Sequence, residues 1–194
     1  AFDWYAMGAA GEAPSARARF ATTMQTTLER LTAANEVLIQ RDYHAESLLW
    51  LPDRAGVARV GLLDFQDAMR GHRAYDLVSL LQDARRDVPP AIEEAMIARY
   101  VEETGPDPSQ FRTDYNRLGA QRNLRIIGVF ARLCLRDGKA HYVDLIPRVW
   151  GHLMRNLEDP ALADVATLVK QGLPTPDADF LERLKDQCAT HPTP

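Results

Sequence analysis

Two patterns of apolar and polar residues divide the chain. Between residues 37 and 64 the apolar residues fall in short runs separated by polar or turn-forming residues, as is typical of short strands. The runs are Val37–Ile39, Ser47–Leu51 and Val57–Leu63. Because Pro52 to Gly56 supply turn chemistry between the last two runs, we predict that these two pair as a hairpin.

The rest of the chain follows the helical period, with apolar residues three or four positions apart. Residues 15–34 form one such segment ahead of the strands, and the period returns after Gly71. Proline and glycine at suitable positions mark the helix ends that follow. The predicted helices are 75–85, 90–105, 107–138 and two or three within 139–187. The predicted fold is therefore mainly α-helical with a small β element.

Length and composition describe one globular domain, residues 1–194. The 194 residues are 46% hydrophobic and 26% charged, which excludes a disordered chain. A net charge of −4 argues against a general nucleic-acid-binding protein, which usually carries a basic face. The most apolar helical stretch, 126–135, is short and interrupted by Arg132, so no membrane span is expected.

The two cysteines give no sign of a metal site or a disulfide-rich scaffold. Cys134 and Cys188 lack metal-ligand spacing. We interpret them as reduced thiols of a cytoplasmic protein, while a disulfide between them stays open.

Acidic residues lie at the ends of two predicted strands. Asp42 lies in a polar loop between two apolar runs, and Asp64 follows another apolar run 22 residues later. Carboxylates at neighbouring strand ends suit phosphoryl transfer, because one can orient the attacking hydroxyl while the other holds Mg²⁺ against the phosphate.

These two segments resemble those of a known enzyme family. Residues 40–47 resemble the kinase-like catalytic loop His-x-Asp-x-x-x-x-Asn, and residues 64–66 resemble the metal-binding Asp-Phe-Gly segment. The residues of these two segments are similar to those of the aminoglycoside-phosphotransferase family, in particular its N-acetylmuramate and N-acetylglucosamine kinase branch. Enzymes of that branch phosphorylate the anomeric hydroxyl of these sugars. The resemblance is dense over residues 38–88 and thinner to about residue 157. It implies the C-terminal lobe of the protein-kinase-like fold.

The resemblance also implies a role for individual residues. Asp42 would be the catalytic aspartate, and Asp64 with Ser47 would bind the metal. Arg41 and His44 would shape the loop. Two further aspartates match as well: Asp76 as a brace for the loop, and Asp67 as a substrate or supporting contact.

Two positions depart from the family pattern. Gln40 stands where the family has its leading histidine, and Ser47 stands where it has the metal-binding asparagine. A serine hydroxyl is shorter than an amide, so either a water completes the Mg²⁺ site or metal binding is weakened.

The sequence shows no glycine-rich phosphate loop and no strand lysine ahead of residue 37. We therefore expect that the ATP-binding N-lobe is absent from these residues and that the isolated chain is inactive. ATP and Mg²⁺ would serve the complete enzyme, and its small-molecule partner would be an amino sugar. The alternatives are a degenerate lobe that acts as a binding or scaffold module, and a plain helical interaction domain that matches by chance.

One set of basic residues has no place in these motifs. Arginines recur along the predicted helix 107–138, and we interpret most of them as a solvated face, with room for one to bind a phosphate or an acidic sugar. They are Arg117, Arg122, Arg125, Arg132 and Arg136.

Overall fold

The computed structural model describes residues 1–6, 17–31 and 36–191. A short π-helical turn, η1 (Phe2–Ala6), opens the chain. The helices are α2 (Arg17–Glu29), α3 (Tyr75–Leu81), α4 (Pro90–Thr104), α5 (Pro108–Leu135), α6 (Ile146–Asn156), α7 (Ala163–Gly172) and α8 (Ala178–Asp186). The strands are β1 (Glu36–Ile39), β2 (Leu48–Trp50), β3 (Val60–Leu62) and β4 (Met69–His72). Mainly helical architecture with a small β element is confirmed.

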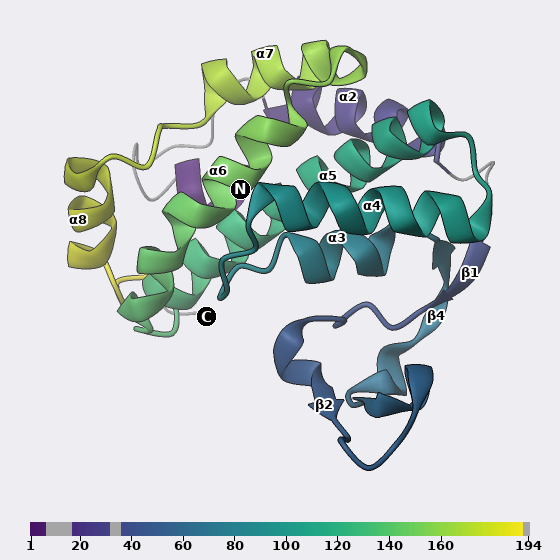
Figure 1. Cartoon of the computed structure of the whole chain (residues 1–194). Helices are drawn as coiled ribbons and strands as arrows, with labels where there is room; N and C mark the ends of the chain where they lie inside the picture. The colour runs from purple at the N-terminus through teal and green to yellow at the C-terminus, as the bar shows by residue number, and fades with distance from the viewer. Residues whose placement is uncertain (7–16, 32–35, 192–194) are drawn as a thin grey trace.

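Helix α5 is the axis of the helical body (Figure 1). It packs against α6, α3, α4, α8 and the N-terminal turn η1. Its start follows from sequence, because the Asp107 side chain accepts a hydrogen bond from the Gln110 N–H and Pro108 suits the first turn. Gly105, at φ 73°, ends the preceding α4 in the left-handed region.

Two hydrophobic clusters lie on either side of α5. The larger joins the second half of α5 to α6, α7, α8 and η1, and it includes Ile127, Leu153 and Val169. The smaller joins α3 and α4 to the first half of α5, around Val78 and Tyr115. Because helices from both ends of the sequence share these clusters, the body folds as one unit.

The β segment, residues 36–72, projects from one side of the helical body, below α3 and α4 (Figure 1). Strand β2 pairs antiparallel with β3, which confirms the predicted hairpin. Strand β1 pairs antiparallel with β4, a strand that the sequence pattern did not predict. At this pair a Cβ on Gly71 would overlap the Ile39 side chain, so only glycine allows the close approach.

Several predicted boundaries are wrong by a few residues. The first predicted helix is described as Arg17–Glu29, and its other predicted residues either turn or lie outside the described residues. The predicted strand at 57–63 begins as a 3₁₀ turn, η3 (Gly56–Arg59), before β3. Helix α3 stops at Leu81, so residues 82–85 of the predicted helix form a loop instead.

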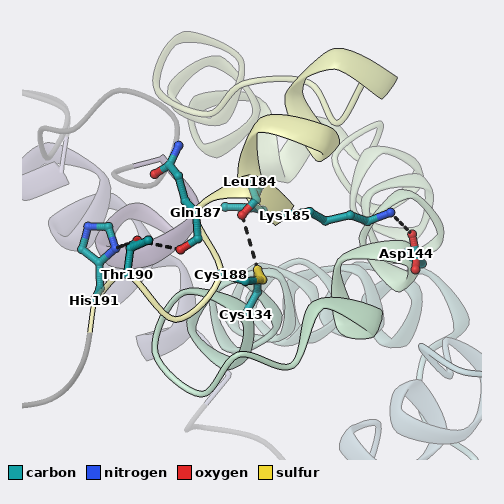
Figure 2. The surroundings of a disulfide bond; sticks show 8 residues. All are labelled: Cys134, Asp144, Leu184, Lys185, Gln187, Cys188, Thr190 and His191. Atoms are coloured by element: carbon teal, nitrogen blue, oxygen red, sulfur yellow. Dashed lines mark hydrogen bonds and ion pairs between the residues drawn. A yellow bond between two sulfur atoms is a disulfide. The ribbon is translucent and has the colours of Figure 1, made fainter.

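The structure joins Cys134 and Cys188 in a disulfide, so the reduced-thiol interpretation is wrong (Figure 2). Cys134 lies in the last turn of α5, and Cys188 follows α8 with its Cα 4.7 Å away. Nearby, Lys185 pairs with Asp144 at 2.8 Å. The bridge fastens the C-terminal helix to the central helix. No helix within the described ranges is both long and apolar enough to cross a membrane.

Candidate active site

The loop between β1 and β2 is anchored to the helical body by one carboxylate. Asp76, in the first turn of α3, accepts hydrogen bonds from the backbone N–H of Gln40 at 2.7 Å and of Arg41 at 3.1 Å. Burial raises the pKa of Asp76, while the two N–H groups and the Arg122 charge act in the opposite direction. Asp76 therefore fixes where the loop leaves β1.

The backbone of this loop is turned sharply just before Asp42. Arg41 has φ 71°, in the left-handed region that an arginine enters at a cost on the order of 1–3 kcal/mol. The Asp42 N–H donates to the Gln40 carbonyl at 2.9 Å, and the His44 N–H donates to the Asp42 carbonyl at 3.1 Å. The hydrogen bonds to Asp76 help to hold this conformation, which leaves the Asp42 side chain exposed.

Ser47, at the end of the loop, meets the segment after β3. Its Oγ lies 3.5 Å from an Asp64 carboxylate oxygen and 3.5 Å from His44 Nε2. The Leu63 N–H donates to the Ser47 carbonyl at 2.9 Å, which locks the two segments together. Asp64 also has a left-handed backbone, with φ 54°. Two strained residues thus bracket one site, as is common where function constrains the backbone.

The oxygen atoms of Ser47 and Asp64 suit a magnesium ion. Mg²⁺ prefers oxygen ligands and is usually bound by one or two carboxylates together with waters and substrate phosphates. Within residues 1–6, 17–31 and 36–191, no group of three or more acidic, histidine or cysteine side chains could hold a metal. The donor set therefore fits an ion that shares its ligands with a phosphate, and it does not fit a closed structural metal site.

A pocket of about 220 Å³ lies between this loop and helix α5. The loop contributes three side chains, α5 contributes five, and α3 with the loop after it contributes four. They are Arg41, Asp42, His44, Tyr75, Asp83, Ala84, Arg85, Arg122, Arg125, Ile126, Val129 and Phe130. Asp42, whose side chain is exposed, thus lies at the wall of a partly open pocket that a small molecule can enter.

The structure brings some of the predicted residues to this pocket and not others. Arg41, Asp42 and His44 line it. Ser47 and Asp64 meet each other beside the loop, outside the lining. Asp76 supports the loop from α3, and Asp67 lies exposed in the short turn η4 (Phe65–Asp67).

Sequence reasoning missed Asp83 and misjudged part of the arginine row. Asp83 was placed inside a helix, yet it lies in the loop after α3, buried at the pocket. Arg117 is buried and pairs with Asp114 at 3.0 Å, so the solvated-face interpretation is wrong for it. Arg122 and Arg125 turn toward the pocket from α5, and their spacing of three residues is the signal that could have shown a shared helix face.

Residues 2–112, more than half of the chain, match the phosphotransferase enzyme family. The match includes the loop with Asp42, the segment with Asp64 and the whole of the β segment. A plain helical interaction domain that resembles the family by chance is therefore excluded.

Three curated relatives carry the name N-acetylmuramate/N-acetylglucosamine kinase. The protein from Caulobacter vibrioides is 50% identical over 139 residues, which cover 71% of this chain and 38% of the relative. The Neisseria meningitidis protein is 39% identical over 69% of this chain and 40% of its own length. The Pseudomonas putida protein is 31% identical over 80% of this chain and 47% of its own length. The chain spans less than half the length of these relatives, and it belongs to the phosphotransferase enzyme family.

Proposed function

We propose that this chain is the C-terminal, acceptor-binding lobe of a kinase-like fold, and that the complete protein transfers the γ-phosphate of ATP to a hydroxyl of an amino sugar. One observation carries the proposal. Asp42 lines a small-molecule pocket, while Ser47 of the same loop meets Asp64 just outside it. This arrangement supports a role for Asp42 as proton acceptor on the acceptor side and for Ser47 and Asp64 as metal ligands on the phosphate side.

In this proposal Asp42 orients the sugar hydroxyl and accepts its proton as the hydroxyl attacks the phosphorus. Asp64 and Ser47 would hold Mg²⁺, which when bound would neutralise charge on the phosphate oxygens. Arg41 and His44 would shape the loop around the acceptor, and Asp67, exposed in the turn after Asp64, would contact the substrate or support the site. Asp76 keeps the loop in register with α3.

We further propose that residues outside these 194 supply most of the nucleotide site. The β segment exposes large apolar side chains that the helical body does not cover: Trp50 is 65% exposed, Phe65 67% and Leu49 47%. Such a patch is typical of a surface that another part of a protein covers. The chain alone should therefore bind ATP with Mg²⁺ weakly or not at all.

The amino-sugar acceptor is proposed from the names of the relatives, which phosphorylate N-acetylmuramate and N-acetylglucosamine. The mixed pocket lining suits a sugar, because charged groups can bond its hydroxyls while Ile126, Val129 and Phe130 offer an apolar wall. The net charge of the chain, −4, makes nucleic acid an unfavoured partner. A cytoplasmic location, where ATP is available, belongs to the same proposal.

A second candidate function is a non-catalytic lobe that binds a sugar without phosphorylating it. The replacements Gln40 and Ser47 favour this alternative, because the family has a histidine and a metal-binding asparagine there. It would keep the pocket but lose Mg²⁺-dependent transfer.

The test is Asp42→Asn in the complete protein that carries this sequence. We expect the turnover of amino-sugar phosphorylation to fall by about 10²- to 10⁴-fold, because the variant cannot accept the proton. The melting temperature should hardly change, since Asp42 is exposed. Asp53→Asn, an exposed aspartate in the β2–β3 turn, is the matched control and should keep full activity.

Two results would decide against the kinase. Equal activity of the Asp42 and Asp53 variants would remove Asp42 from the mechanism. A wild-type protein that binds an amino sugar, yet transfers no phosphate in the presence of ATP and Mg²⁺, would establish the non-catalytic alternative.

A further inference from the structure

Three polar atoms of the pocket side chains lack hydrogen-bond partners. His44 Nδ1, Asp83 Oδ2 and Arg122 Nη1 are buried and neither donate nor accept a hydrogen bond within the described part of the chain. Buried polar atoms are nearly always paired, so each exception calls for an explanation. Six other buried polar atoms of the described residues are also unpaired, but these three belong to side chains that line one pocket, where a ligand can supply the missing partners.

Asp83 and Arg122 are each held in place by a second, satisfied contact. One Asp83 carboxylate oxygen accepts a hydrogen bond from the Arg85 N–H at 2.8 Å, which leaves the other oxygen unpaired. The Arg122 Nη2 donates to Ser79 Oγ at 2.7 Å, which leaves Nη1 unpaired. Burial lowers the pKa of Arg122, while nearby Tyr75, Asp83 and Asp42 act in the opposite direction. Both groups are therefore positioned before a ligand arrives.

The pocket lining carries excess positive charge. Four guanidinium groups, those of Arg41, Arg85, Arg122 and Arg125, face only two carboxylates, Asp42 and Asp83. Part of the Arg85 charge is directed at Glu46, 3.6 Å away. Arg122 and Arg125, one turn apart on α5, remain available to an anion because neither forms an ion pair at 4 Å or less within the described residues.

The anion in this pocket need not be the nucleotide. The metal-binding oxygens of Ser47 and Asp64 lie outside the lining, so the phosphate side of Asp42 lies outside it too. The same helix that carries Arg122 and Arg125 also presents Ile126, Val129 and Phe130. A ligand with a carboxylate next to small apolar groups would meet both requirements, because guanidinium groups bind carboxylates strongly and apolar walls bind methyl groups.

We propose, on the basis of the proposed function, that Arg122 and Arg125 recognise the carboxylate of an acidic amino sugar, and that this pocket selects acidic over neutral acceptors. Asp83 would accept a hydrogen bond from a sugar hydroxyl or from the acetamido N–H. N-acetylmuramate differs from N-acetylglucosamine by a lactic acid ether, which adds one carboxylate and one methyl group. These two sugars therefore test the selection directly.

The experiment measures how tightly each sugar binds the complete protein without nucleotide, by NMR titration. The wild type should prefer N-acetylmuramate by about tenfold or more, the value of a charge-assisted hydrogen bond. Both Arg122→Gln and Arg125→Gln should reduce this preference several-fold or more. Because Arg122 is largely buried, the exposed Arg125 provides the variant that keeps the fold intact. Arg99→Gln, on the outer face of α4, is the charge-matched control and should keep the preference.

A neutral analogue and a small anion complete the test. The amide of N-acetylmuramate has no carboxylate, so the wild type should not prefer it over N-acetylglucosamine. The arginine substitutions should not improve its binding. If inorganic phosphate displaces the sugar and the preference for the acid vanishes, the arginines bind phosphate and the proposal is overturned. Equal binding of both sugars by the wild type, or an unchanged preference in both arginine variants, would overturn it as well.

The same measurements separate this proposal from the proposed kinase activity. Selective binding of the acidic sugar without phosphate transfer would refute the kinase and keep the arginine assignment. Phosphate transfer to both sugars with equal efficiency would keep the kinase and refute the assignment.

Discussion

The helical body and the β segment contain similar fractions of apolar residues, yet these residues differ in how far they are buried. In the body, Ile127, Leu153 and Val169 have no exposed surface at all. In the β segment, Trp50 and Phe65 each expose about two thirds of their surface. The body thus builds its own core, whereas the β segment is held by a few polar contacts and offers its apolar side chains outward. The pocket lies where the two regions meet, with Asp42 from the β segment and Arg122 from the body in its lining.

Buried polar groups lie both inside the helical body and at the pocket. In the body, the Gln82 side chain bonds Glu93, Asn123 and Asn156 at 2.8–3.0 Å, which ties α4, α5 and α6 to the end of α3. Gly119 is required there, because a Cβ would overlap Asn156. Asn123 Oδ1, within this network, nevertheless has no hydrogen-bond partner, and the same is true of Asp83 Oδ2 and Arg122 Nη1 at the pocket. The pocket atoms differ in that they belong to side chains that line a cavity, where a ligand can supply the missing partner.

The largest effect should come from replacing one leucine in each region. Leu153→Ala removes a side chain with no exposed surface from the larger cluster, so the free energy of unfolding should fall by about 2–5 kcal/mol. Leu49→Ala, in β2 with 47% of its surface exposed, should cost less than about 1 kcal/mol. Urea denaturation of both variants measures the difference. Equal losses would show that the β segment has a core of its own and would break the comparison.

A smaller effect should appear as a pH dependence that His152 gives to the body, beside that of His72 in β4, whose pKa burial also lowers. His152 on α6 is buried, and Arg155 Nη2 lies 2.8 Å from its Nδ1. Burial first, and the Arg155 charge second, lower the pKa of His152 to about 4. In the unfolded chain the pKa of a histidine is about 6.5, so below that pH His152 binds a proton in the unfolded state but not in the folded state. The stability that comes from keeping His152 neutral is therefore fully present above the unfolded-state pKa and is lost as the pH falls toward 4.

We expect His152 to account for about 1–3 kcal/mol of lost unfolding free energy between pH 7 and pH 4.5. Urea denaturation of wild type and His152→Gln at both pH values measures this share, since the variant should lose less stability on acidification. His141→Gln serves as the control for replacing an exposed histidine. An identical loss in wild type and His152→Gln would show that His152 is protonated in the folded state.

Where the sequence carried a local signal, the prediction was right. The β2–β3 hairpin follows from the turn residues between its strands, and α5 begins at Pro108 because Asp107 caps it. Both signals act within a few residues of the element they determine. The same holds for the resemblance to the family, which rests on short segments around Asp42 and Asp64.

Where distant residues decide, the prediction failed. Strand β4 has no apolar alternation, and it pairs with β1, more than thirty residues away in sequence, where Gly71 lies close to the Ile39 side chain. Helix α3 ends early with Gln82 held by Asn123 and Asn156, and this ending turns Asp83 toward the pocket. The contact between Ser47 and Asp64 and the set of side chains at the pocket therefore needed the folded chain, because no local pattern encodes contacts across such separations.

The smallest effect should come from the metal-binding oxygens of the β segment. Ser47→Asn should lower the Mg²⁺ concentration needed for half-maximal phosphoryl transfer by about threefold to tenfold, since the amide oxygen reaches further toward the ion than a hydroxyl. Ser47 Oγ lies 3.5 Å from the Asp64 carboxylate, so a longer side chain can close the gap. Because Ser47 is buried, fitting the larger side chain should cost about 1–3 kcal/mol of stability, and activity must be measured well below the melting temperature. Ser47→Ala, which removes the oxygen, should shift the Mg²⁺ requirement in the opposite direction. If neither variant changes that requirement, Ser47 is only a buried loop residue, and Asp64 would hold the ion without it.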